Sequence, residues 1–146
     1  MTRDPSLPEQ SGGPELEALE PPGWAKPKGY ANGIAVRGAS ELVFVAGQIA
    51  WDAAQQLVGR GDFVAQFRQA LANVAAVVRT AGAEPQHIVR LTIYVTDKHL
   101  YLGALREVGA AYREVLGRHY PAMALVQVAD LLEDGALVEV EATAVR

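Results

Sequence analysis

The chain has 146 residues, of which half are apolar, and a formal net charge of −4 at pH 7. This length is typical of one domain with a real hydrophobic core, and the acidic balance argues against a nucleic-acid partner. The chain contains no cysteine, which excludes disulfides and thiolate chemistry. No apolar stretch reaches the ~18 residues of a membrane span, and residues 1–13 lack an apolar signal core. We therefore expect a soluble, cytoplasmic protein without a membrane partner.

Residues 1–28 differ in composition from the rest of the chain. They contain six of the eight prolines and four glutamates, and little apolar material apart from Trp24. Such a segment cannot bury enough apolar surface to offset the entropy lost on ordering, so we predict an extended or disordered leader. The folded domain is expected over residues 29–146.

Two strands and a helix are predicted in the first half of this domain. Residues 34–38 and 42–50 read as strands, and a Gly-Ala-Ser turn joins them. After a polar loop, Asp62 is a plausible N-cap for a helix. Apolar residues then recur at spacings of three and four as far as Gly82, which ends an amphipathic pattern.

The second half predicts one more helix and three more strands. Residues 87–97 are rich in β-branched and aromatic side chains, which is typical of a strand. Residues 98–116 carry a second helical stripe, and residues 122–129 and 136–145 are expected to be strands. The order β-β-α-β-α-β-β predicts an α+β fold in which two helices pack on one face of a mixed sheet.

The strand predicted at residues 42–50 has two apolar faces. Two helices cover only one face of a sheet, so the other face needs a cover from elsewhere. The pattern therefore predicts a homo-oligomer. Its two faces consist of Val43, Val45 and Ile49 on one side and Leu42, Phe44 and Ala46 on the other.

Five stretches of the domain carry a resemblance to a known family. They are LVFVAGQIA, QFRQALANV, LTIYVTD, HYPAMALVQVA and LVEVEATAV. In their order and spacing, from about Gly29 to Val145, the chain resembles the RidA (YjgF) family of enamine/imine deaminases. The resemblance implies a chorismate-mutase-like subunit and a homotrimer whose sheets form a central barrel. It also implies three small-molecule clefts between subunits.

The resemblance implies five site positions in this sequence. Two of them have the residue typical of the family's deaminases, and three have a different residue. Met123 stands where the family's deaminases have an arginine that grips the substrate carboxylate. Leu105 stands in place of an asparagine, and Ala46 in place of a serine. Tyr30 matches the tyrosine near the cleft mouth, and Glu139 matches the glutamate proposed to handle the attacking water. The resemblance thus implies Glu139 as the catalytic residue and the other four as substrate-binding positions.

Glu139 and Glu141 alternate in LVEVEA and therefore lie on the same face of the last strand. Imine hydrolysis needs a held substrate, an oriented water and a proton shuttle, which one carboxylate can provide. The same pattern is also typical of a solvated edge or of structural carboxylates. Glu141 fits that structural interpretation better than Glu139.

Five further residues are candidates for the site. Gly47 lies inside a strand, where a glycine either kinks the sheet or lets its backbone contact a ligand, and Gln48 follows it. His119, beside the Tyr-Pro that opens the next strand, is either a cleft-rim acid or base or a surface histidine. Arg37 and Lys98 are cations that could replace the lost arginine.

No metal or organic cofactor is predicted. The three histidines lack the spacing of metal ligands. No glycine-rich phosphate loop follows a strand. Hydrolysis of an imine also requires no cofactor.

Met123 decides the expected ligand. It is either an ordinary core methionine or the apolar wall of a cleft that has lost its carboxylate clamp. A carboxylate buried against a thioether would be costly, so an apolar, aromatic or amide-bearing ligand is expected. The leading interpretation is a divergent enzyme that hydrolyses an imine, enamine or related C–N bond. The alternative is a non-catalytic metabolite-binding trimer, and ribonuclease activity is the third possibility.

Overall fold

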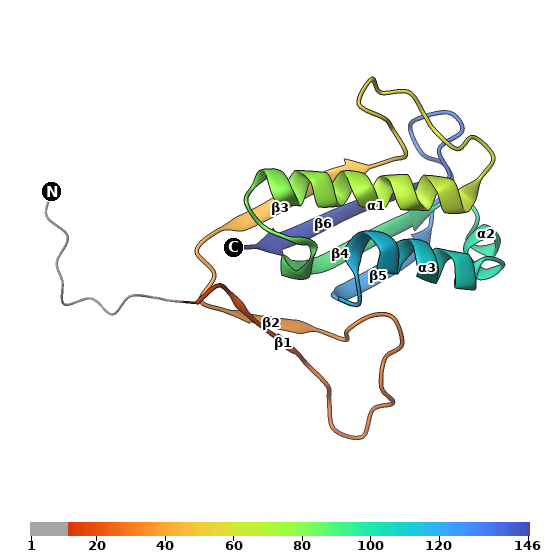
Figure 1. Ribbon diagram of the computed structural model, residues 1–146. Coiled ribbons are helices and arrows are strands. Elements are labelled where there is room, and N and C mark those ends of the chain that lie inside the picture. Colours follow the sequence, from red (N-terminus) through yellow and green to blue (C-terminus); the bar gives the residue numbers. More distant parts are fainter. Residues whose placement is uncertain (1–11) are drawn as a thin grey trace, which may run out of the picture.

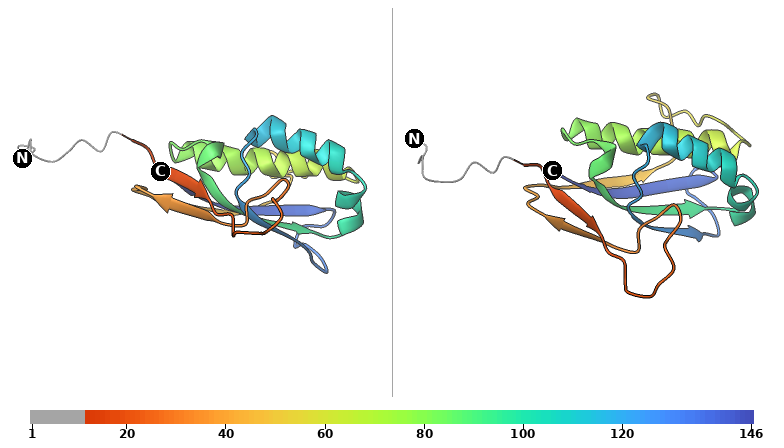
Figure 2. Two further views of the ribbon diagram at one scale, coloured as in Figure 1. Left: turned by 90° about the horizontal axis from the view of Figure 1, so that it is seen from below. Right: turned by 60° about the horizontal axis from the view of Figure 1, so that its bottom comes forward.

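The computed structural model describes residues 12–146 and has two layers (Figure 1). One layer is a four-stranded mixed sheet, and the other consists of helices on one of its faces (Figure 2). This arrangement confirms the predicted α+β fold class. In spatial order the strands are β3 (Leu42–Gln48), β6 (Val138–Val145), β4 (Ile88–Val95) and β5 (Ala122–Gln127).

The connections follow from the strand directions. β6 pairs antiparallel with both β3 and β4. β5 runs parallel to β4, and a parallel neighbour requires a crossover rather than a hairpin. The helices α2 (Lys98–Leu102) and α3 (Leu105–Leu116) provide this crossover. β3 and β5 thus form the two edges of the sheet.

Helix α1 (Phe63–Thr80) begins where the sequence predicts it. The Asp62 carboxylate accepts a hydrogen bond of 3.0 Å from the Ala65 amide, which confirms Asp62 as the N-cap. The buried face of α1 packs on the sheet and supplies much of the core. This core contains Phe67, Leu71, Val74 and Val78 from α1 and Leu91, Val95, Val138 and Val140 from the sheet.

The helix predicted over residues 98–116 is two helices. Asp97 caps α2 by accepting a hydrogen bond of 2.8 Å from the His99 amide. The chain then turns at Gly103, where a Cβ would lie 3.0 Å from the His99 carbonyl oxygen. The apolar spacing continues across this turn, so the pattern suggested one uninterrupted helix. A 3-10 turn, η1 (Pro85–His87), leads into β4.

Two short strands form a separate sheet. β1 (Glu15–Ala18) lies inside the predicted leader and pairs antiparallel with β2 (Ile34–Arg37). We expected β2 to join the main sheet beside β3, but its partner is β1. Leu16 faces Val36 in this ladder, and Arg37 forms an exposed ion pair with Glu17. The division of the chain at residues 28 and 29 stays a prediction.

The face of the sheet opposite the helices is open in this single chain. Phe44 is 74% exposed there, and Leu42 is 62% exposed. The helices lie on the other side of the sheet (Figure 2). An uncovered apolar face of β3 is what the two-sided pattern of this strand predicted. Within residues 12–146, no helix is long and apolar enough to cross a membrane.

Candidate functional site

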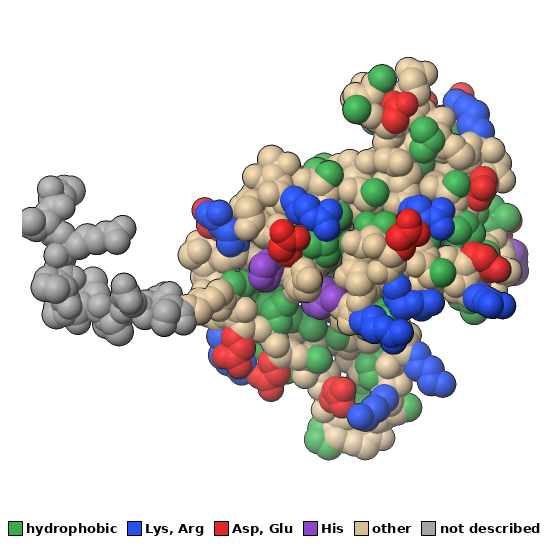
Figure 3. Space-filling view, in the orientation of Figure 1, with side chains coloured by type: hydrophobic (Ala, Val, Ile, Leu, Met, Phe, Trp, Pro, Cys, Tyr) green, Lys and Arg blue, Asp and Glu red, His purple; other side chains and the backbone are tan. Residues whose placement is uncertain are grey.

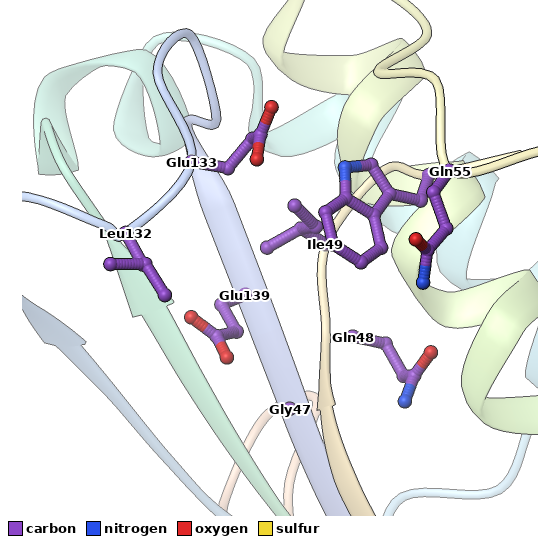
Figure 4. A pocket seen from close by; sticks show the side chains of 8 residues that line it. Gly47, Gln48, Ile49, Gln55, Leu132, Glu133 and Glu139 are labelled. Atoms are coloured by element: carbon purple, nitrogen blue, oxygen red, sulfur yellow. The ribbon is translucent and has the colours of Figure 1, made fainter.

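Glu139 lies in a pocket of about 340 Å³ at the β3 edge of the sheet (Figure 4). Two predicted site residues of β3, Gly47 and Gln48, line the same pocket. The wall is completed by side chains from the loops that follow β3 and precede β6. These are Ile49, Trp51, Gln55, Leu132 and Glu133.

A β-bulge brings Gly47 next to the Glu139 side chain. Val45 pairs with Ala142 and Gln48 with Val140, so β3 has one extra residue between these pairs. A Cβ on Gly47 would lie 2.9 Å from Cδ of Glu139 and 3.1 Å from its Cγ. A glycine therefore leaves room for the glutamate side chain in this position, and a larger residue would force that side chain to move. The bulge agrees with the possibility that Gly47 bends the sheet, and the close approach of Glu139 is a second reason for a glycine at this position.

Two amides on α1 hold the wall of this pocket. The side-chain amide of Asn73 donates to the carbonyl oxygens of Ile49 and Trp51, at 3.0 and 2.9 Å. Gln69 donates to the Asn73 side-chain oxygen at 2.9 Å, which fixes the orientation of the Asn73 amide. The chain leaving β3 is thus anchored to the helix layer.

Gln66 is a positioning residue that the sequence reasoning missed. It is fully buried, and its side chain donates to the carbonyl oxygens of Gly59 and Gly135 at 3.1 and 3.0 Å. Its side-chain oxygen accepts from the Leu137 amide at 2.8 Å. These bonds fix the start of β6 and thereby Glu139. The available signal was a glutamine on the apolar stripe of α1, one residue before Phe67.

Glu141 has a different environment from Glu139. Its carboxylate accepts a hydrogen bond of 2.9 Å from the Tyr94 hydroxyl. This bond, with burial as a smaller cause, raises the pKa of Tyr94. Among residues 12–146, Glu139 forms no hydrogen bond or ion pair through its carboxylate, which leaves it available to a ligand or water.

Met123 and Leu105 lie in a second pocket, of about 310 Å³, beneath α3 and beside β5. Met123 is half-buried and packs against the core, while Leu105 is 53% exposed at the rim. Tyrosines dominate the rest of the wall. Tyr112 stacks on Tyr120 with ring centroids 5.4 Å apart, and burial raises the pKa of the Tyr112 phenol.

Tyr30 adjoins this region through backbone contacts. Ala31 forms a bridge to Ala122, and its amide donates to the Pro121 carbonyl oxygen at 2.9 Å. Tyr30 and Met123 consequently line a shared surface pocket, together with Arg90. The resemblance placed Tyr30 at the cleft mouth, and the structure places it next to Met123.

The remaining candidates take no part in these three pockets. Ala46 lies in the bulge, and its carbonyl oxygen accepts from the Gln48 side chain at 3.0 Å. His119 has its Nε2 2.6 Å from the Ile88 carbonyl oxygen, and its own carbonyl accepts from Tyr112. This contact ties β5 to β4, so a role of His119 as acid or base gains no support from it. Arg37 is paired with Glu17, and Lys98 also lies outside the pockets.

The predicted site residues therefore form two groups on one chain. Gly47, Gln48 and Glu139 gather at the β3 edge, whereas Tyr30 and Met123 gather at the β5 edge. The first group provides a carboxylate in a pocket, and the second an apolar and aromatic wall. Among the described residues, no group of three or more His, Cys, Asp or Glu side chains could hold a metal ion.

Comparison with known proteins found a matching family model and several relatives of this chain. The family model described as endoribonuclease L-PSP matches residues 25–146. Protein DfrA of Myxococcus xanthus is 38% identical over 120 residues, which are 80% of this chain and 84% of that protein. The 2-iminobutanoate/2-iminopropanoate deaminase of Salmonella typhimurium is 36% identical over 120 residues, covering 80% of this chain and 87% of the deaminase.

Comparison with solved structures points to the same family. The crystal structure of YyfB from Yersinia pestis, a protein of unknown function of the conserved Rid family, has a TM-score of 0.76 to this chain at 32% identity. The similarity covers 90% of this chain and 98% of that protein. The chain therefore belongs to the endoribonuclease L-PSP family, which is the RidA (YjgF) family that its sequence resembles.

Proposed function

We propose that this protein is a homotrimer that hydrolyses an imine, enamine or related C–N bond of a small metabolite, with Glu139 as the catalytic residue. One observation carries the proposal. The Glu139 carboxylate lies in a pocket against Gly47, and within the described chain it has no hydrogen-bond or ion-pair partner. The similarity of this chain to the deaminase of Salmonella typhimurium supports the same chemistry.

The chemistry follows from a single carboxylate. Water attacks the carbon of the protonated imine, and Glu139 accepts the proton that this water loses. A C–O bond forms, and the resulting carbinolamine breaks its C–N bond as the proton passes to the leaving nitrogen. The products are a carbonyl compound and ammonia or an amine. No redox step is involved, so neither an oxidant nor a reductant is needed.

The trimer is proposed because each chain contains half of a site at either edge of its sheet. Gly47 belongs to edge strand β3 and Met123 to edge strand β5. In a ring of identical subunits, one edge of each subunit meets the opposite edge of the next. Such a contact would join the Glu139 pocket of one subunit to the Met123 wall of its neighbour. It would also cover the exposed Phe44.

A non-catalytic, metabolite-binding trimer is the second candidate. It is favoured by Met123, Leu105 and Ala46, which depart from the residues that the resemblance implies for deaminases. Ribonuclease activity, which the family description names, is less favoured because the net charge is −4.

Ammonia release separates the first two candidates. Freshly generated imines with small, branched and aromatic side chains would be offered to the wild-type protein. We expect release from at least one apolar or aromatic imine and little from 2-iminopropionate. Absence of release from the whole panel would favour the binding protein.

Light scattering should give about three times the 15.6 kDa chain mass, and a stable monomer would contradict the shared site.

A further inference from the structure

A single cation lies at the pocket beneath α3, whose wall includes Met123 and Leu105. The neighbouring surface pocket that Met123 shares with Tyr30 has a cation of its own, Arg90. Eleven residues line the pocket beneath α3, and Arg113 on α3 is the only charged one among them. The others are apolar or aromatic, apart from two glycines. In space-filling view, Lys and Arg side chains gather below α3 on this side of the molecule (Figure 3). The pocket is thus apolar in its walls and positive at one point.

The Arg113 guanidinium lies over a glycine of the same helix. A Cβ on Gly109 would lie 3.1 Å from Nη1 of Arg113 and 3.9 Å from its Cζ. Both residues line the pocket. Gly109 stands one helical turn before Arg113, in the interior of α3. Its missing side chain lets the guanidinium lie close to the helix and next to the pocket, where an alanine would push it outward.

The glycine has a cost that packing does not explain. A glycine inside a helix is about 0.5–1 kcal/mol less favourable than alanine. A Cβ at position 109 would meet only the movable end of Arg113, so no rigid neighbour demands a glycine. Placement of the guanidinium is the one structural consequence of Gly109 within this pocket.

The Arg113 guanidinium also has no interaction partner among residues 12–146. Four arginines of the described chain form ion pairs with glutamates, namely Arg37, Arg68, Arg79 and Arg146. Arg113 forms neither an ion pair nor a side-chain hydrogen bond with any residue in the range 12–146. A planar guanidinium without a partner at the wall of an apolar pocket suits a bidentate contact with a carboxylate.

We propose that Arg113, placed by Gly109, binds the carboxylate of an aromatic or branched apolar acid whose body fills the pocket around Met123 and Tyr120. The charge lost at position 123 is thereby supplied from helix α3 rather than from strand β5. A volume of about 310 Å³ suits a single aromatic ring with a short acidic chain. This inference rests on the proposed function only in treating the pocket as part of the substrate site.

Binding of an unreactive pair of probes tests the proposal. 3-Phenylpropionate and its neutral analogue 3-phenylpropionamide would be titrated into the full-length protein by calorimetry. The acid should bind more tightly than the amide. Arg113→Gln should weaken the acid roughly 10-fold, the loss of one charge-assisted contact at a partly exposed site, and leave the amide unchanged. Arg106→Gln removes the same charge from α3 outside the pocket and should change neither affinity.

Gly109→Ala provides a second, independent readout. It should raise the melting temperature, because the helix gains a better helix former, and yet weaken binding of the acid. A variant that gains stability and loses affinity cannot owe the loss to unfolding. Equal binding of acid and amide, no binding of the acid at millimolar concentration, or an unchanged affinity in Arg113→Gln would overturn the proposal. Because neither probe reacts, these outcomes are distinct from a failure to release ammonia.

Discussion

The Glu139 pocket and the Met123 pocket are built by different means. At the β3 edge, backbone features dominate: a bulge, a glycine without room for a side chain, and loops anchored by buried amides. Beneath α3, the wall consists of interchangeable side chains around a movable guanidinium. Backbone constraints are hard to change one residue at a time, whereas side-chain walls are easily altered. We therefore expect chemistry to reside in the first pocket and selectivity in the second.

The largest effect is expected from Glu139→Gln. The amide keeps the shape of the side chain but cannot accept the proton of the attacking water. Turnover of the best imine should fall ~10²–10⁴-fold, with an unchanged assembly mass. Rates of ammonia release check this. Glu141→Gln is the matched control on the same face, and it should be milder because that carboxylate is already occupied by Tyr94. Equal losses in both variants would remove the special role of Glu139.

A smaller loss is expected from Gly47→Ala. The new Cβ would meet the Glu139 side chain and displace its carboxylate. A misplacement of about 1 Å can reduce turnover ~10²-fold. Steady-state kinetics should show a reduced kcat with little change in the melting temperature. Gly13→Ala changes a glycine with nothing near its Cβ position and without a positive φ, and it leaves Glu139 untouched, so its kcat should be that of wild type.

Met123→Arg should give a moderate gain in binding at the other pocket. An arginine on β5 can pair with a small carboxylate that the thioether cannot hold, and one charged contact corresponds to roughly 10-fold in affinity. Calorimetric titration of a small 2-oxo acid into both proteins measures the gain. Met123→Leu conserves the apolar wall and should show none. Tight binding of the 2-oxo acid by the wild type would mean that another cation already holds it.

Deletion of residues 1–22 should have the smallest effect. It removes β1, but a two-stranded ribbon apart from the main sheet adds little stability. The melting temperature should fall by only a few degrees, on the order of 1 kcal/mol, with the assembly mass reduced only by the missing residues. Scanning calorimetry and light scattering check this. A collapse of the assembly would place β1 in the subunit interface.

The sequence predicted the parts of the fold that a regular pattern encodes. The apolar spacing of α1 and its Asp62 cap specified that helix, and the two apolar faces of β3 predicted an uncovered sheet face. β1 escaped prediction because a four-residue strand within a proline-rich segment has too few residues to show alternation. The turn at Gly103 was missed because the apolar spacing continues across it.

The candidate site was predictable only in part. The resemblance identified Glu139, and the position of a glycine inside a strand singled out Gly47. Their close approach depends on a bulge, and register is set by pairing between distant strands. Gln66 acts through two loops that no local pattern connects. Nothing in the sequence distinguishes Arg113 from the other charged residues of its helix. Its position at a pocket follows from how α3 packs on β5, which a single sequence does not display.

The hydrogen bonds of Gln66 have a consequence for motion. One side chain of α1 joins the loop at Gly59 to the loop at Gly135 and holds the Leu137 amide. Because the Gln66 side chain is fully buried, we expect these bonds to stay closed while the helix remains on the sheet. We therefore expect the two loops to move together as one unit. Faster movement is expected at the exposed tip around Leu132, at the mouth of the Glu139 pocket.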